Sequence, residues 1–509
     1  MILNLFPSRP DHPLADAKEF KRILAELRVD KPVNAVDELT GWFESLKHAR
    51  NFRLDHYFDL LRQLDDAGQQ HLRRLAREYL TSPQLSPLER KRLWERSYSY
   101  WNTATAAYAS CIERAKLEAK GRGSDAFRAS LPLADTRLQA ARRRCIKWLA
   151  YCYEPAGSDL WRELGQSYLA AEAAGHAQKL VQLYPGRMGV TSVAQQYLHS
   201  LLFSASSMDG LSPQEIELAD RVIAHFLSIV SWSSERHSDS VYWVDAAAAS
   251  PPARLAIHPG ASTPSLRFVS PVPALSGLDE LIHMVERDEI PARLNLGGEY
   301  SQKALLSVLR HLRAYWAVRP LQRRHQRHAV RTRMAVLAGF DHAYQVFSGA
   351  LGRHGSVAAT RSWVVENVSL GGFRVCFDDP AGNGIKLGTL LCMQPEGGEN
   401  WLLGTARRFN RLGGVQANLG VQLISKQAQS IELRPRRSGF AAAVALPGIW
   451  LRDAGESGTV RIVLPLGSFN VRETLDFSLD GRAYLLTPAE FEESGCDYDI
   501  ARFHDQLVS

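Results

Sequence analysis

The sequences LQRRHQR (residues 321–327) and NVSLGG (residues 367–372) decide how the rest of the chain is interpreted. Arg323 and Arg327 are four residues apart, with Arg324 between them, so the outer pair shares one face of either a strand or a helix. A guanidinium group binds phosphate oxygens bidentately, and it also pairs with the edge of guanine or stacks on the base. The first sequence therefore predicts a site for a ligand that carries both groups.

The second sequence has the composition of a tight turn after a strand. Asn367 and Ser369 are two residues apart, so both side chains leave a strand on the same face and offer short polar groups to a ligand or to the backbone. Gly371 and Gly372 permit positive φ angles and a close approach of a ligand to the main chain. The second sequence therefore predicts a turn that can approach a ligand closely.

The region from about residue 321 to residue 425 resembles the PilZ family, bacterial receptors for the second messenger cyclic di-GMP. The motifs R-x-x-x-R and N-x-S-x-x-G occur in the family's order, and WLLGTARRF (residues 401–409) and NLGVQLI (residues 418–424) look like its paired late strands. The resemblance implies a six-stranded antiparallel β-barrel, an arginine linker that wraps over cyclic di-GMP, and a turn that recognises one guanine. The residues that it assigns to the ligand are Arg323, Arg324, Arg327, Asn367, Ser369, Gly371 and Gly372.

The spacing between the two motifs is longer than is usual in the PilZ family. Residues 340–348 predict a short helix and residues 349–356 a glycine-rich loop, within an insertion over residues 340–362 at the barrel rim. We expect this insertion to act as a partner site or as a partial lid. Arg407 or Arg408 is expected to line the pocket.

The positive charge of the chain is concentrated near the arginine linker. The 509 residues carry a net charge of +7, and residues 301–340 contain nine Lys and Arg residues with no Asp or Glu. The rest of the chain is therefore slightly negative. This distribution suits a compact anionic ligand better than a nucleic acid, which requires a basic face spread over more surface.

Patterns typical of catalysis are not found, and we expect a protein that is not an enzyme and has no cofactor. The six cysteines lack C-x-x-C spacing, which favours free thiols in a reducing compartment. The histidines at 311, 325, 328 and 342 are an unfavourable metal site because the neighbouring arginines repel a cation. The sequence shows no membrane-spanning apolar run and no signal peptide, so we expect a cytoplasmic protein.

Residues 1–234 predict an α-helical bundle or solenoid. Apolar residues recur at helical spacing over residues 36–46, behind an expected Asn34 cap, and over residues 54–64. The sequence SPLE (residues 86–89) is a capping box that opens a long helix. The segment 161–183, which begins WRELGQSY, resembles the first helix of a tetratricopeptide repeat.

The remaining regions predict a multidomain α + β protein. Residues 235–320 predict a small α+β module with short strands near residues 241, 254 and 266, followed by two helices, the second of which leads into the linker. The expected barrel domain spans residues 321–435. Residues 436–509 predict a small β domain, a degenerate second barrel or another β structure, in which Asp480 and Gly481 mark a hairpin.

The favoured interpretation is a cyclic di-GMP receptor in which the ligand orders the linker and changes a partner-binding surface on the helical domain. The alternative is a scaffold or adaptor protein with a degenerate, non-binding barrel. A nucleic-acid binder is a third, less favoured alternative. The identity of the protein partner, a homo-oligomeric state and the number of ligands per site stay open.

Overall fold

The computed structural model describes residues 10–27, 30–49, 51–118, 120–186, 189–260, 262–289, 294, 296–319, 322, 325–350, 360–379, 384–413, 415–436, 444–453, 458–479 and 481–508. Two compact units are present. The helical unit comprises residues 1–208 and 213–321, and the barrel unit comprises residues 209–212 and 322–509. The predicted multidomain α + β class is confirmed at this level.

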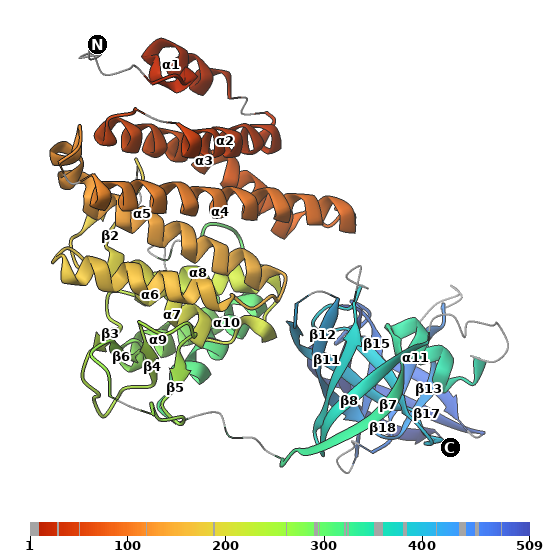
Figure 1. The fold of residues 1–509 in the computed structure, drawn as a ribbon. Coiled ribbons are helices and arrows are strands. Elements are labelled where there is room, and N and C mark those ends of the chain that lie inside the picture. The colour runs from red at the N-terminus through yellow and green to blue at the C-terminus, as the bar shows by residue number, and fades with distance from the viewer. Residues whose placement is uncertain are drawn as a thin grey trace, which may run out of the picture. The chain divides into compact units, whose positions relative to one another are not determined.

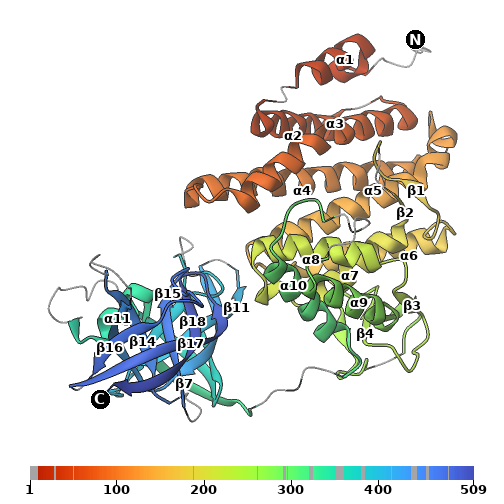
Figure 2. The same ribbon diagram turned by 180° about the vertical axis from the view of Figure 1, so that it is seen from behind.

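The helical unit begins with layers of helices that succeed one another in chain order. Figures 1 and 2 show α1 at one end, then a layer of α2 and α3, then a layer of α4 and α5, and then the remaining elements. The helices are α1 (Ala17–Glu26), α2 (Pro32–His48), α3 (Leu54–Thr81), α4 (Pro87–Leu117), α5 (Ser124–Tyr151), α6 (Ser158–Ala173), α7 (Val193–Ala205), α8 (Pro213–Phe226), α9 (Leu275–Glu286) and α10 (Gln302–Trp316). Short 3₁₀ helices span Pro13–Ala15, Met208–Gly210 and Val272–Ala274.

One of the two predicted helix starts is confirmed and the other is wrong. The capping box before α4 is confirmed, because the Ser86 side chain accepts from the Glu89 N–H and the Glu89 side chain accepts from the Ser86 N–H. The expected Asn34 cap is wrong. Helix α2 begins three residues earlier than an Asn34 cap implies, with Pro32 at its first position and Lys31 as a cap that makes no side-chain hydrogen bond. The fixed φ of proline favours that earlier start.

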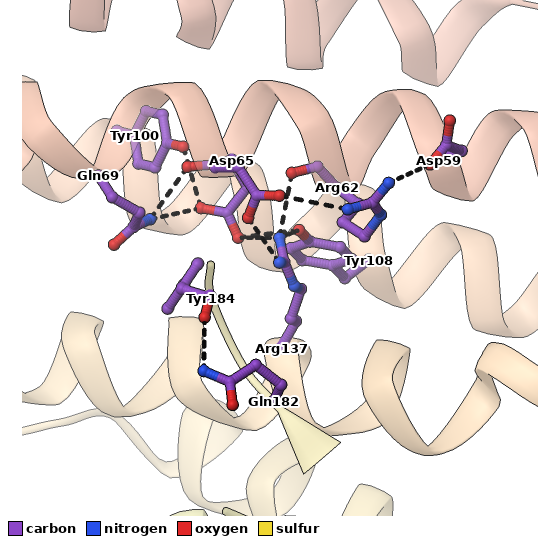
Figure 3. Close-up of polar contacts among 10 residues, drawn as sticks. Asp59, Arg62, Asp65, Gln69, Tyr100, Tyr108, Arg137, Gln182 and Tyr184 are labelled. Atoms are coloured by element: carbon purple, nitrogen blue, oxygen red, sulfur yellow. Dashed lines mark hydrogen bonds and ion pairs between the residues drawn. The ribbon is translucent and has the colours of Figure 1, made fainter. Parts of the chain in front are cut away.

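A buried charge cluster joins α3, α4 and α5 (Figure 3). Asp65 accepts hydrogen bonds from the hydroxyls of Tyr100 at 3.1 Å and Tyr108 at 2.9 Å. The Arg137 guanidinium, only 2% exposed, lies 3.2 Å from Asp65 Oδ2 and 2.6 Å from Asp66 Oδ1. Burial raises the pKa of both tyrosines well above the usual value, so they stay neutral donors. Removing Asp65 would therefore leave a buried cation short of a partner.

A second buried cluster joins α5 to α7 and α8. Arg143 Nη1 lies 2.6 Å from Asp220 Oδ1, and Lys147 Nζ lies 2.7 Å from Glu217 Oε2 and 2.9 Å from Asp220 Oδ2. His199 Nε2 lies 2.8 Å from Asp220 Oδ1. Burial, reinforced by the cation of Arg143, lowers the pKa of His199 to about 4, so this imidazole is neutral at pH 7.

The segment that resembles a tetratricopeptide repeat is a buried helix without the second helix of a repeat. Trp161 and Tyr168 are buried on α6, but the next elements after α6 are the paired strands β1 (Val181–Gln182) and β2 (Val190–Thr191). A Cβ on Gly165 would lie 1.9 Å from the carbonyl oxygen of Ala246, so this glycine permits close packing of α6 on that backbone. The Trp and Tyr of this pattern therefore serve core packing in α6.

The predicted α+β module is part of the same compact unit as the preceding helices. Its sheet has the order β3-β6-β4-β5, with β3 (Ser231–Ser233), β4 (Tyr242–Asp245), β5 (Ala253–Arg254) and β6 (Leu266–Ser270). Trp316 of α10 is fully buried, meets the ring of Phe226 edge-on and donates its indole N–H to Ser206 Oγ at 3.0 Å. The last helix before the linker is thus anchored on α8 and on the end of α7.

The barrel unit contains two closed six-stranded antiparallel barrels. The first has the strand order β10-β11-β12-β9-β8-β7, closed by pairing of β7 with β10. Its strands are β7 (His328–Ala338), β8 (Arg361–Ser369), β9 (Gly372–Asp378), β10 (Leu390–Pro395), β11 (Leu402–Arg411) and β12 (Gln416–Ser425). The rings of Trp363 and Phe377 stack at 4.4 Å in its core.

The second barrel has the order β13-β14-β15-β18-β17-β16. Its strands are β13 (Ala428–Pro435), β14 (Leu446–Leu451), β15 (Thr459–Pro465), β16 (Leu475–Leu479), β17 (Arg482–Ser494) and β18 (Tyr498–Val508). In both barrels the ring runs first, second, third, sixth, fifth, fourth strand, so the two have the same topology. Strand β13 precedes the expected domain start at residue 436, and the hairpin at Gly481, with φ of +76°, is present.

Helix α11 (Phe340–Phe347), the predicted short helix, packs between the two barrels. Phe340 is buried in one core together with Cys392 of the first barrel and Ile449 of the second. Asp497, from the second barrel, accepts backbone hydrogen bonds from Phe340 at 3.1 Å and Leu390 at 3.0 Å. The described part of the insertion therefore joins the barrels. Residues 351–359 of the insertion lie outside the described residues.

Candidate functional site

The first barrel carries a cavity of about 540 Å³ at the end where β7 begins. Three chain segments meet there: the linker before β7, the turn between β8 and β9, and the connector after β12. The lining residues are His325, Gln326, His328, Val368, Ser369, Leu370, Phe373, Leu402, Leu423 and Lys426. Two segments that are about 40 residues apart in sequence, the linker and the glycine turn, therefore line one cavity.

Strand pairing brings the linker to the turn. His328 pairs with Val368 and Ala329 with Asn367, so the first residues of β7 lie beside the last residues of β8. The register shifts between Ala329 and Thr332, which marks a β-bulge. A bulge twists and bends its strand, and here it lies where the chain leaves the barrel toward the linker.

The turn depends on its two glycines. Gly372 has φ of +152°, and a Cβ on it would lie 2.0 Å from the carbonyl oxygen of Val421 in β12. A Cβ on Gly371 would lie 3.1 Å from Cδ2 of His325, so the linker lies directly against this glycine. The Ser369 hydroxyl donates to the Gly372 carbonyl oxygen at 3.2 Å and closes the turn. Small residues thus allow β12 and the linker to approach the turn from two sides.

The seven predicted site residues have different positions. Ser369 lines the cavity, and Gly371 and Gly372 form the turn beside it. Asn367 pairs with Ala329 but does not line the cavity. Arg327 is exposed and lies between two lining residues, Gln326 and His328. The predictions for Arg323 and Arg324 fall outside the described residues.

Sequence reasoning missed several lining residues, above all Phe373 and Lys426. Phe373 comes directly after the N-x-S-x-x-G motif. An aromatic residue at that position is a signal for the site that the motif itself does not include. Lys426 is the first residue after β12, just past the end of the PilZ-like region. The expected pocket role of Arg407 or Arg408 is not supported: neither lines the cavity, and Arg407 forms an ion pair with Glu493 of the second barrel.

The lining combines an apolar wall with a polar rim. Val368, Leu370, Leu402, Leu423 and Phe373 contribute the wall, and none of the described lining residues is acidic. Apolar surface with one aromatic ring suits the flat face of a base, whereas Lys426 and the linker supply cationic and hydrogen-bonding groups for an anion. The arrangement therefore fits a ligand that has both planar rings and negative charge.

Other kinds of site are not indicated in the part of the chain that the structure describes. No group of three or more His, Cys, Asp or Glu side chains there has a metal-binding arrangement. Its helices include none that is both long and apolar enough to cross a membrane. The six cysteines are free thiols.

Comparison with known proteins gives one family match. Residues 18–235, less than half of the chain, match the family model described as "Cyclic-di-GMP receptor FimW, N-terminal domain". The match begins in α1 and ends just after β3, so it lies in the helical unit and does not include the cavity. The match supports the interpretation of this protein as a cyclic di-GMP receptor. No curated protein matches the chain.

Proposed function

We propose that this protein is a cyclic di-GMP receptor and that its first barrel is a PilZ-type domain that binds the messenger in the cavity. The observation that carries the proposal is the meeting of the linker and the glycine turn: His325 lies against Gly371, and both segments line the same cavity. The family match supports it independently, because the matched receptor domain lies in a different part of the chain.

In the proposed mechanism the linker is the element that changes. Arg327 lies in the sequence between two residues that line the cavity, and Arg324 and Arg323 precede it by three and four residues. Guanidinium groups that bind the phosphates would hold the linker against the turn, and a linker that is held in one conformation would limit the arrangements of the helical unit. The helical unit would then present or withdraw a surface for a protein partner in the cytoplasm. The mechanism requires no catalysis and no further cofactor.

Isothermal titration of the full chain with cyclic di-GMP tests the proposal. We expect saturable binding with a defined stoichiometry and loss of at least 10-fold in affinity for Arg323→Ala and for Arg327→Ala, because each removes charged hydrogen bonds of about 1.5–3 kcal/mol. Lys386→Gln is the matched control, since it removes one charge from a residue of the same barrel that does not line the cavity. Wild-type affinity in both arginine variants would refute the assignment.

The scaffold alternative makes the opposite prediction. A barrel that does not bind the messenger gains no thermal stability from it, whereas a receptor gains RT ln(1 + [L]/Kd). A thermal-shift series over increasing cyclic di-GMP concentration therefore separates the two functions.

A further inference from the structure

Because the two barrels have the same topology, the place in the second barrel that corresponds to the cavity of the first can be identified. In the first barrel the cavity lies where the chain before the first strand meets the turn after the second strand. The corresponding place in the second barrel lies where the chain before β13 meets the chain after β14. The pairing of Ala428 with Leu451 brings these segments together, as that of His328 with Val368 does in the first barrel.

In the second barrel this place is closed by a carboxylate. Asp453 accepts hydrogen bonds from the Lys426 N–H at 2.7 Å and from the Ser425 hydroxyl. The Arg452 N–H donates to the Gln427 carbonyl oxygen at 2.8 Å and adds a backbone bond between the same segments. A carboxylate in the position where the first barrel has its cavity would repel a phosphate ligand. The second barrel is therefore unsuited to bind the same kind of ligand at its equivalent site.

The segment that Asp453 holds also belongs to the first barrel. Ser425 is the last residue of β12 and is buried, and the next residue, Lys426, lines the cavity. Ser425 Oγ also accepts a hydrogen bond from the Gln427 N–H at 3.1 Å, so the backbone is fixed on both sides of Lys426. A lysine on a fixed backbone loses less conformational freedom on binding than one on a mobile loop.

We propose that Lys426 binds a phosphate group of the ligand in the first barrel, and that Asp453 of the second barrel is a positioning residue that holds the lysine at the cavity. The inference rests on the proposed function, because it adds a cation to the same site. It also gives the second barrel a role, which is to hold the backbone of a residue that lines the first site. Lys426 is the one Lys or Arg among the described lining residues, so its charge adds to that of the linker arginines.

Titration of full-length variants with cyclic di-GMP tests the inference. We expect Lys426→Gln to weaken binding about 10-fold or more and to reduce the dependence of affinity on salt, because one charge–charge contact is lost. Lys426→Arg should stay within about threefold of the wild type. Lys386→Gln again serves as the matched loss of charge, and it should change neither the affinity nor its salt dependence.

The positioning role requires a double-variant test. Asp453→Asn should weaken binding less than Lys426→Gln does, and Asp453→Asn combined with Lys426→Gln should be no weaker than Lys426→Gln alone. Fully additive effects would show that Asp453 acts through the general stability of the barrel, and would overturn its role. Wild-type affinity and salt dependence in Lys426→Gln, with binding lost in Arg327→Ala, would overturn the inference and leave the proposed function intact. A wild-type protein that does not bind cyclic di-GMP would overturn both.

Discussion

Substitution by alanine at the two adjacent glycines of the β8–β9 turn should affect two different properties, barrel stability at Gly372 and ligand binding at Gly371. Gly372→Ala introduces a Cβ 2.0 Å from the Val421 carbonyl oxygen, at a φ of +152° that other residues rarely adopt. Because this contact is with the backbone of the neighbouring strand, β9 and β12 have to separate by about an ångström. Backbone strain and the lost strand contact together should cost about 2–4 kcal/mol.

Gly371→Ala places its Cβ 3.1 Å from Cδ2 of the His325 ring, and a side chain can move away by a few tenths of an ångström. The free energy of unfolding should change by less than about 0.5 kcal/mol. The linker is displaced from the turn, however, so cyclic di-GMP should bind about threefold more weakly, or weaker still. The first substitution therefore tests the barrel and the second tests the contact between linker and turn.

Scanning calorimetry and ligand titration of the two full-length variants are the assays. At about 2–4 °C per kcal/mol, the melting transition of the barrel unit should fall by roughly 4–16 °C in Gly372→Ala and by less than about 2 °C in Gly371→Ala. Equal melting temperatures for the two variants would refute the close approach of β12 to Gly372. Wild-type affinity in Gly371→Ala would refute the contact between the linker and the turn.

Three further predictions concern the ligand site and the helical unit. Phe373→Ala should weaken cyclic di-GMP binding by about 1–3 kcal/mol in calorimetric titration, because the ring no longer stacks on a base, whereas Phe373→Tyr should retain binding. Asp65→Ala should lower the free energy of unfolding of the helical unit by about 3–5 kcal/mol in urea titration, because among the described residues Arg137 keeps only the half-buried Asp66 as an ion-pair partner, and an unchanged midpoint would contradict this. The pKa of His199 is about 4 when folded and 6.5 when unfolded, so the unfolded chain takes up the proton first and stability should fall by about 3 kcal/mol as the pH drops from 6.5 to 4; His199→Gln should flatten that slope in unfolding measured at several pH values.

Local signals in the sequence were sufficient for several element types. The capping box at Ser86, the hairpin at Gly481 and the helix that begins at Phe340 are each set by a few neighbouring residues, and each is present. The repeat-like pattern on α6 does not by itself indicate a repeat, because Trp161 and Tyr168 at helical spacing are compatible with any buried helix face. The elements that come after α6 depend on the packing of distant segments.

The candidate site shows the same division. The sequence alone contained the basic linker and the glycine turn, and their resemblance to the PilZ motifs predicted that the two flank one barrel. Only the tertiary structure decided that Phe373 and Lys426 line the cavity, and that Asp453 holds the backbone of the lysine there. The physical reason is that strand pairing and barrel closure bring together residues that are far apart in the chain, and no local pattern specifies which of them meet.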